Sequence, residues 1–231
     1  MEERTRAPYF DLRRYEKLLK KAAENGEVDA LVELGDIYVR GRTKDYAKAV
    51  RCYLEAANID YAPAQDKMGI MYRDGLGVER DYKQALYWFD QAAGQGYTKS
   101  QSRIGQMYDS GKGVEKDYQK ASEWYRLAAE NGDFVGQYLL GCMYECGEGV
   151  EKDVTEAAYY YRLSAEQGYK EAQRKMSQWM IGNMYYEGDS VKKDTGKAYE
   201  WYQKSALQGY ELAQQKVSRM IDSGEAAGRF Y

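Results

Sequence analysis

The feature that most limits how this chain can fold is an internal repeat with a period of about 36 residues. A glycine followed three residues later by tyrosine recurs in the segments LGDIYVRG, MGIMYRDG, IGQMYDSG, LGCMYECG and IGNMYYEG. The glycines, spaced 34, 36, 36 and 41 residues apart, are Gly35, Gly69, Gly105, Gly141 and Gly182. A second motif follows each of them and reads DYAKAVRCYLEAA, DYKQALYWFDQAA, DYQKASEWYRLAA, DVTEAAYYYRLSA and DTGKAYEWYQKSA. Each unit is therefore predicted to be a helix, a turn and a second helix.

The residues between the two motifs are typical of one helix ending and another beginning. Turns such as GLGVERD and GEGVEKD place glycine where the first helix ends and the left-handed conformation is common. An aspartate precedes each second helix, where its carboxylate can accept a backbone N–H bond and interact with the helix dipole. These residues are Asp45, Asp81, Asp117, Asp153 and Asp194. No strand precedes the turn glycines, so they do not indicate a phosphate-binding loop.

The recurring glycine inside each first helix costs about 1 kcal/mol relative to alanine and needs a compensating contact. We expect this contact to be a closely packed neighbouring helix, with small residues such as Ala85 and Ala121 on the facing surface. A single helical hairpin leaves one face uncovered, so consecutive units should stack. The sequence therefore predicts an all-α fold, a right-handed α-solenoid.

The repeat pattern also predicts the boundaries of the units within a single repeat domain, residues 1–231. Five full units are expected at 27–59, 60–95, 96–131, 132–167 and 168–208. The segment 11–26 fits a second helix alone, and the segment 209–223 fits a first helix alone. About twelve helices are therefore expected.

Composition argues against catalysis. The chain has 231 residues, a formal net charge of −3, no histidine, and three cysteines without a CxxC spacing. Without histidine, Ser/His/Asp triads, Cys/His pairs and HExxH zinc sites are excluded. The odd cysteine count indicates neither a disulfide framework nor a thiolate metal site. We therefore expect no enzyme activity, no cofactor and no metal.

Charge and hydropathy favour a soluble cytoplasmic protein. The N-terminal sequence MEERTRAPYFDLRR lacks an apolar h-region, and no segment approaches the roughly eighteen apolar residues that a membrane span needs. A pI near 5.4 argues against duplex nucleic acid as a partner. Paired aromatic residues in the second helices resemble a stacking platform for single-stranded nucleic acid, but their recurrence at one position favours a core role.

The combined pattern A-x₃-LG-x₂-Y-x₂-G-x-GV-x₂-D-x₃-A-x₂-WY-x₂-AA-x₂-G resembles the Sel-1-like repeat class of the tetratricopeptide superfamily, across roughly residues 11 to 221. The resemblance implies an adaptor that gathers other proteins on a curved surface and has no catalytic activity. An alternative is a tight-binding inhibitor or immunity-type protein that sequesters a toxin or an enzyme. A very tight stoichiometric complex would distinguish this alternative from a weak peptide adaptor. The oligomeric state is not predicted.

Helical angles predict which side chains of the first helices face a partner. Position zero is the small residue Ala30, Ala64, Ser100, Gly136, Ala172 or Ala213. Positions four, five, seven and eight are then core, whereas positions two, three and six point toward the expected concave groove. Position three, which is mostly basic, reads Glu33, Lys67, Arg103, Leu139, Lys175 and Lys216. This row suggests a groove for an acidic peptide with Arg103 as a bidentate clamp, or else ordinary solvated charge.

An apolar patch is expected in the middle of the same surface. It comprises Ile70, Tyr138, Leu139 and Cys142, and exposed apolar clusters rimmed by charge often mark interaction sites. Curvature or neighbouring tyrosines would bury the patch instead. The candidate protein-binding residues are Lys67, Ile70, Arg103, Gln106, Tyr138, Leu139, Cys142, Lys175 and Lys216.

One unit departs from the common length. Five residues are added between Ala172 and Gly182, relative to the corresponding AQDKMG segment. At about 100° per residue, this insertion rotates the helix by roughly 140° net. We expect a longer helix, with Trp179 and Met180 on a face that other units lack. Such a face would serve docking or dimerisation, or the insertion would be absorbed as a kink or bulge.

Overall fold

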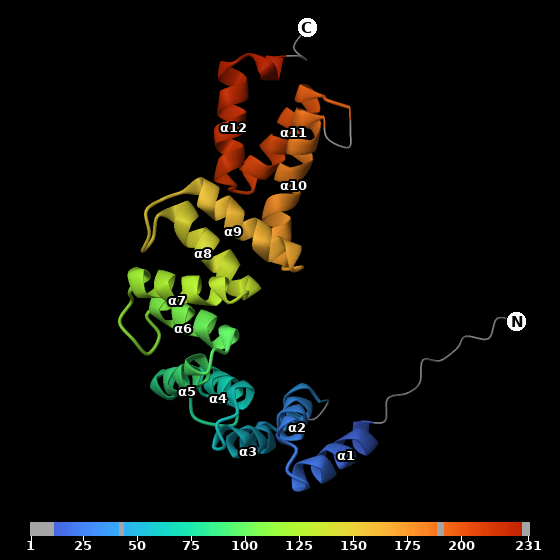
Figure 1. The fold of residues 1–231 in the computed structure, drawn as a ribbon, viewed down its shortest axis with the longest axis vertical. Helices are drawn as coiled ribbons and strands as arrows, with labels where there is room; N and C mark the ends of the chain where they lie inside the picture. The colour runs from blue at the N-terminus through green and yellow to red at the C-terminus, as the bar shows by residue number, and fades with distance from the viewer. Residues whose placement is uncertain (1–11, 42–43, 189–191, 228–231) are drawn as a thin grey trace, which may run out of the picture. The chain divides into compact units, whose positions relative to one another are not determined.

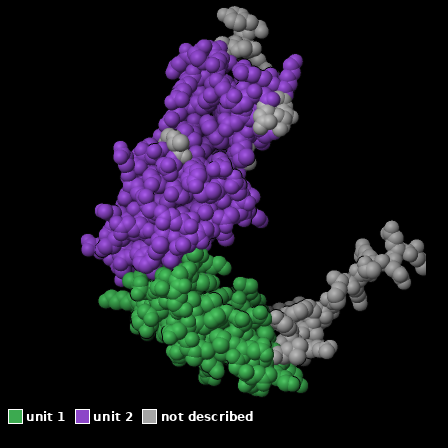
Figure 2. Space-filling model, in the orientation of Figure 1, with its two compact units in different colours: residues 1–100 green, residues 101–231 purple. Residues whose placement is uncertain are grey.

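The computed structural model describes residues 12–41, 44–188 and 192–227, and all regular secondary structure in these ranges is helical (Figure 1). The elements are α1 (Leu12–Glu24), α2 (Val28–Arg40), α3 (Tyr46–Ala57), α4 (Ala62–Asp74), α5 (Tyr82–Gly94), α6 (Thr98–Ser110), α7 (Tyr118–Glu130), α8 (Phe134–Cys146), α9 (Val154–Glu166), α10 (Lys170–Glu187), α11 (Thr195–Leu207), α12 (Glu211–Asp222) and the 3₁₀ helix η1 (Glu225–Ala227). The chain divides into two compact units, residues 1–100 and 101–231 (Figure 2).

Within each unit, helices pack against their neighbours in sequence. In residues 1–100, α1 packs on α2, α2 on α3, α3 on α4, and α4 on α5. In residues 101–231, the same holds for the successive helices from α7 to α12. This nearest-neighbour packing is typical of an α-solenoid and confirms the predicted all-α repeat fold. Helix α1 lies within the segment expected to be a terminal second helix and α12 within the segment expected to be a terminal first helix, and the unit boundaries stay a prediction. Residue 11, the predicted start of the first half-unit, lies outside the described residues.

The helix ends follow the predicted chemistry. The side chain of Asp45 accepts a hydrogen bond from the backbone N–H of Lys48 at 3.0 Å, and the four equivalent aspartates make the same type of cap. The glycines that end α4, α8 and α10 adopt left-handed backbone conformations. Gly41, which ends α2, is the exception with φ −61°, and it lies in the turn that is two residues shorter than the others.

The recurring first-helix glycines make room for an aromatic ring. A Cβ on Gly105 would lie 2.5 Å from the ring of Tyr125 and 3.3 Å from the carbonyl oxygen of Ala121. The same relation joins Gly35 to Tyr53, Gly69 to Phe89, Gly141 to Tyr161, and Gly182 to Tyr202. The predicted close approach is confirmed, although the ring rather than a small residue takes most of the space. These aromatic residues are fully buried, so the second member of each aromatic pair belongs to the core.

The buried tyrosines keep their hydroxyl groups hydrogen-bonded to the preceding first helix. Tyr53 donates to Asp36 at 2.5 Å, and Tyr161 donates to Glu145 at 2.7 Å. Tyr202 likewise donates to Asn183 at 2.7 Å. Because a buried hydroxyl is costly without a partner, these bonds allow tyrosine to fill a core that contains few aliphatic side chains.

The backbone conformation of Asp60 predicts a substitution that stabilises the protein. Asp60 has φ 60°, and it is the only residue other than glycine with positive φ in the described ranges. Asp60→Gly should raise the free energy of unfolding by about 0.5 kcal/mol, because glycine adopts this conformation without steric strain and the bond that is lost, from Gln65 Nε2 to Asp60 Oδ1, is long at 3.4 Å. Denaturant titration measures the change, and the reciprocal Gly132→Asp variant should lower stability by a similar amount. A less stable Asp60→Gly protein would contradict this account.

Candidate protein-binding surface

The predicted basic row is partly used inside the fold. The Lys67 ammonium lies 2.6 Å from Asp36 Oδ1, and both side chains are about three-quarters buried. Burial alone would raise the pKa of Asp36, but hydrogen bonds from Lys67 and Tyr53 and the lysine charge hold this pKa below its usual value. Lys67 therefore joins α4 to α2, and its charge is neutralised by the preceding repeat.

Lys175 makes an equivalent link between α10 and α8. Its ammonium donates to Glu145 Oε2 and lies 2.9 Å from the hydroxyl oxygen of Tyr161. Burial, with further contributions from Cys142 and Glu145, raises the pKa of Tyr161. In both places a lysine at position three, an acidic residue of the preceding first helix and the tyrosine between them form one cluster. We call this arrangement the lysine–tyrosine–carboxylate link.

The other members of the row differ in their surroundings. The Lys216 ammonium lies 3.5 Å from the ring centroid of Tyr186, and Leu139 packs against the core cluster around Tyr125. Arg103 and Gln106 are partly buried on α6. The row is thus not a line of fully solvated charges. Its role in binding an acidic peptide stays a prediction.

The predicted apolar patch is not exposed as expected. Ile70 lies in residues 1–100, whereas Tyr138, Leu139 and Cys142 lie in residues 101–231, and all four are partly buried. The Tyr138 ring lies 5.5 Å from that of Tyr161, and Cys142 Sγ lies 3.4 Å from the Tyr161 hydroxyl. Burial raises the pKa of the Cys142 thiol. Tyr161 of α9 and Tyr169 of the following turn contact this part of α8, in line with the alternative in which neighbouring tyrosines cover the patch. A binding role for these residues stays a prediction.

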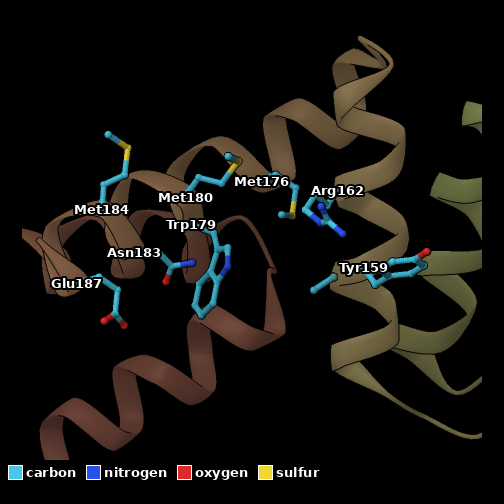
Figure 3. A pocket seen from close by; sticks show the side chains of 9 residues that line it. Tyr159, Arg162, Met176, Trp179, Met180, Asn183, Met184 and Glu187 are labelled. Carbon is cyan, nitrogen blue, oxygen red and sulfur yellow. The ribbon is translucent and has the colours of Figure 1, made fainter. Parts of the chain in front are cut away.

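The inserted residues lengthen α10 as predicted. This helix has 18 residues, whereas α8 has 13. A groove of about 490 Å³ opens between α9 and α10, and we call it the α9–α10 groove (Figure 3). Its lining residues are Ala158, Tyr159, Arg162, Met176, Trp179, Met180, Asn183, Met184 and Glu187.

Large apolar side chains dominate the lining of this groove. Met180 is 52% exposed and Tyr159 is 46% exposed, and both line the same groove. The Trp179 ring packs against two buried tyrosines. Its centroid lies 5.0 Å from that of Tyr202 and 5.5 Å from that of Tyr210. Figure 3 shows the methionines in a row along α10, with Tyr159 and Arg162 on the neighbouring helix. The groove therefore combines an anchored aromatic floor with exposed, flexible walls.

Charged side chains mark the two ends of the groove. The turn between α9 and α10 comprises only residues 167–169, so the carboxyl end of α9 lies close to the amino end of α10. Arg162 lies toward this turn, is about half exposed and forms an exposed ion pair with Glu166 at 3.1 Å. Glu187 is exposed at the opposite end, in the last turn of α10. One end of the groove thus carries an arginine, in an exposed ion pair with Glu166, and the other end carries the Glu187 carboxylate.

The described residues contain no cluster of three or more His, Cys, Asp or Glu side chains that could hold a metal ion. Among the helices described, none combines the length and the apolar character that a bilayer crossing requires. The chemistry available in the α9–α10 groove is apolar contact with charge at both ends.

Sequence reasoning only partly located this groove. The insertion placed Trp179 and Met180 on an unusual face, but neither residue was among the predicted binding residues. Tyr159 and Arg162 were missed because their contribution depends on how α9 packs against α10. A usable signal was present in Met176, Met180 and Met184, since residues four apart share one helix face.

Comparisons with known proteins agree with the repeat geometry. The Sel1 repeat family model matches residues 16–27, 28–61, 62–97, 98–133, 135–169 and 175–210. Residues 170–174 fall between the last two matches, in agreement with the five-residue insertion. No curated protein matches the chain.

Several solved structures are similar. A protective antigen of uropathogenic Escherichia coli with an SLR fold is 38% identical with a TM-score of 0.66, and the match covers 90% of this chain and 44% of that protein. A Sel1 repeat protein from Oxalobacter formigenes is 31% identical with a TM-score of 0.66, over 93% of this chain and 91% of that one. An immunity protein from Pseudomonas aeruginosa is 22% identical with a TM-score of 0.57, over 96% and 77% of the two chains, and this likeness shows the fold alone. The chain spans less than half the length of the Escherichia coli protein.

Proposed function

The chain belongs to the Sel1-repeat family, and we propose that it is a non-enzymatic scaffold that binds a partner protein through the α9–α10 groove. Sel1-repeat proteins are generally scaffolds for protein interactions. The observation that carries the proposal is the exposure of Met180 and Tyr159, which both line one groove with charged side chains at its ends. Exposed apolar surface bordered by charge is typical of protein interaction sites.

Comparison with another repeat supports the choice of this groove. Tyr87 in α5 occupies the same position after its capping aspartate as Tyr159 does in α9, and it is 52% exposed. Tyr87 has no lengthened helix beside it, since α6 has 13 residues. An exposed tyrosine at this position is therefore a shared feature of two repeats. The methionine-lined groove beside Tyr159 comes from the insertion in α10.

Site-specific photo-crosslinking tests the proposal. A photoreactive amino acid replaces Tyr159 in the full chain, which is then irradiated in a lysate of the native organism. We expect one predominant protein adduct, because binding through the groove would place a partner within reach of this side chain. Mass spectrometry identifies the adduct, and the matched control carries the same amino acid at Tyr87.

The adduct at Tyr159 should disappear when Met180→Glu is added, because the new carboxylate would have to lose water in an apolar contact. Equal adduct yields at Tyr159 and Tyr87 would contradict the proposal, and so would an adduct formed only with a second copy of this chain. A stoichiometric complex that persists at nanomolar concentration would indicate a tight inhibitor rather than a weak adaptor.

A further inference from the structure

The residues of α10 that line the groove all lie along one face of this helix. Its groove residues are Met176, Trp179, Met180, Asn183, Met184 and Glu187, spaced by three or four residues or adjacent to such a position. Residues with this spacing form one stripe along a helix, and the stripe from Met176 to Glu187 is about 16 Å long, or three turns. A stripe of this kind is the surface against which another helix packs, with its side chains between the ridges.

The alternatives to a helical occupant fit less well. A peptide that binds as an added β-strand needs a sheet edge with unpaired backbone groups, and the described part of the chain contains only helices. Methionine side chains adapt their shape to the apolar face of a helix, and Met180 and Met184 provide two of them one turn apart, above Met176, which is 5% exposed and belongs to the core. The groove therefore favours the helix-in-groove mode of peptide recognition.

The charges at the two ends indicate a direction. Glu187 lies at the carboxyl end of α10, whereas Arg162 lies near the turn at the amino end of α10. The amino end of a bound helix carries partial positive charge and its carboxyl end carries partial negative charge. An occupant that runs antiparallel to α10 therefore matches both charges. A basic residue in its first turn and an acidic residue in its last turn strengthen the match.

We propose that the α9–α10 groove binds a three-turn amphipathic helix of a partner protein, antiparallel to α10, with a basic residue near Glu187 and an acidic residue near Arg162. This inference rests on the proposed function and specifies the chemistry of the partner. The apolar residues of the bound helix occur at positions i, i+3 or i+4, and i+7, and they contact Met180, Trp179 and Tyr159.

A peptide selection tests this proposal. The full chain is used to select binders from a random display library of 16-residue peptides, after depletion on the Met180→Glu variant. Met180 is half exposed, so this substitution leaves the fold intact, and circular dichroism verifies this. We expect enrichment of sequences with the apolar spacing given above, a basic residue before it and an acidic residue after it. A synthetic enriched peptide should bind the Met180→Glu variant at least tenfold more weakly and the Tyr87→Glu control unchanged.

A charge exchange tests the direction. In a second peptide, the basic and acidic residues trade places while the apolar residues stay fixed. The first peptide should bind the unaltered protein about tenfold more tightly than the second, and the double variant Arg162→Glu, Glu187→Arg should reverse this preference. Isotope-labelled peptide should show helical chemical shifts over about three turns when bound. Bound peptide with extended or polyproline shifts would overturn the proposal, as would a preference that the double variant does not reverse.

The two experiments fail in distinguishable ways. If Tyr159 crosslinks a partner but the selection yields no groove-dependent helical peptide, the helical occupant is wrong while the proposed function remains. If helical peptides are selected but Tyr159 forms no protein adduct, the groove has the inferred specificity and the proposed scaffold function is wrong.

Discussion

Replacing Gly149 by alanine is expected to lower the free energy of unfolding by about 3–5 kcal/mol. Gly149 lies in the turn between α8 and α9 and has φ +69°, which strains any residue with a Cβ. The new Cβ would also overlap the carbonyl group of Tyr118 and lie 2.8 Å from the backbone nitrogen of Gln119. Both atoms belong to the first turn of α7, so no side-chain rotation relieves the overlap. The turn of one repeat would have to separate from the helix of the preceding repeat.

Gly132→Ala is the matched control for this substitution. Gly132 has φ +85°, but nothing beyond its own stretch of backbone lies within 4 Å of the position that the new Cβ would occupy. Its replacement should therefore cost only the backbone strain, about 1–2 kcal/mol. Urea titration of both variants measures the two losses. The difference between them isolates the contact between the turn and α7, and equal losses would show that this contact contributes nothing.

Raising the pH from 10 to 11 is expected to destabilise the unit formed by residues 101–231 by at least about 4 kcal/mol. Four of its tyrosines are at most 2% exposed, namely Tyr125, Tyr161, Tyr202 and Tyr210. In each of them burial is the largest cause that raises the pKa above its ordinary value near 10. The stability contribution of such a group is complete below pH 10. It falls as the pH rises, because the unfolded chain then releases protons that the folded chain retains, at about 1 kcal/mol per tyrosine over this interval.

Denaturant titrations at pH 9, 10 and 11 measure this loss, and tyrosinate absorbance reports when the phenols ionise. Tyr161→Phe is the informative variant. It removes one titrating group, so the fall in stability between pH 10 and 11 should shrink by about 1 kcal/mol, whatever the variant does to stability at neutral pH. Ionisation of every tyrosine near pH 10 without unfolding, these four included, would contradict their burial.

The fold was predictable because its determinants are local and repeated. The capping aspartates, the turn glycines and the glycine–aromatic contacts each occur several times at one spacing, so the pattern identifies helices and their ends. The length of α10 followed from counting residues between Ala172 and Gly182. Each of these inferences needs only the geometry of one helix or one hairpin.

The site was less predictable because it depends on contacts between repeats. Helical angles place Lys67 and Lys175 on the outer face of their own helices, and this is correct for an isolated helix. The preceding repeat then supplies Asp36 and Glu145, whose carboxylates take up the two charges. The α9–α10 groove is similar, since residues of both helices line it and their meeting depends on how α9 packs against α10.

The lysine–tyrosine–carboxylate link has a consequence for the exchange of repeats between arrays. Modular design treats a hairpin as an interchangeable part whose interface suits any consensus neighbour. Here the lysine of one hairpin is matched to an acid and a tyrosine of the hairpin before it, as Lys175 is to Glu145 and Tyr161. A transplanted hairpin with this lysine needs a compatible predecessor, because it would otherwise bury an ammonium group without a counter-charge. The natural unit for shuffling is thus a pair of adjacent hairpins, and the order of repeats in this chain carries information of its own.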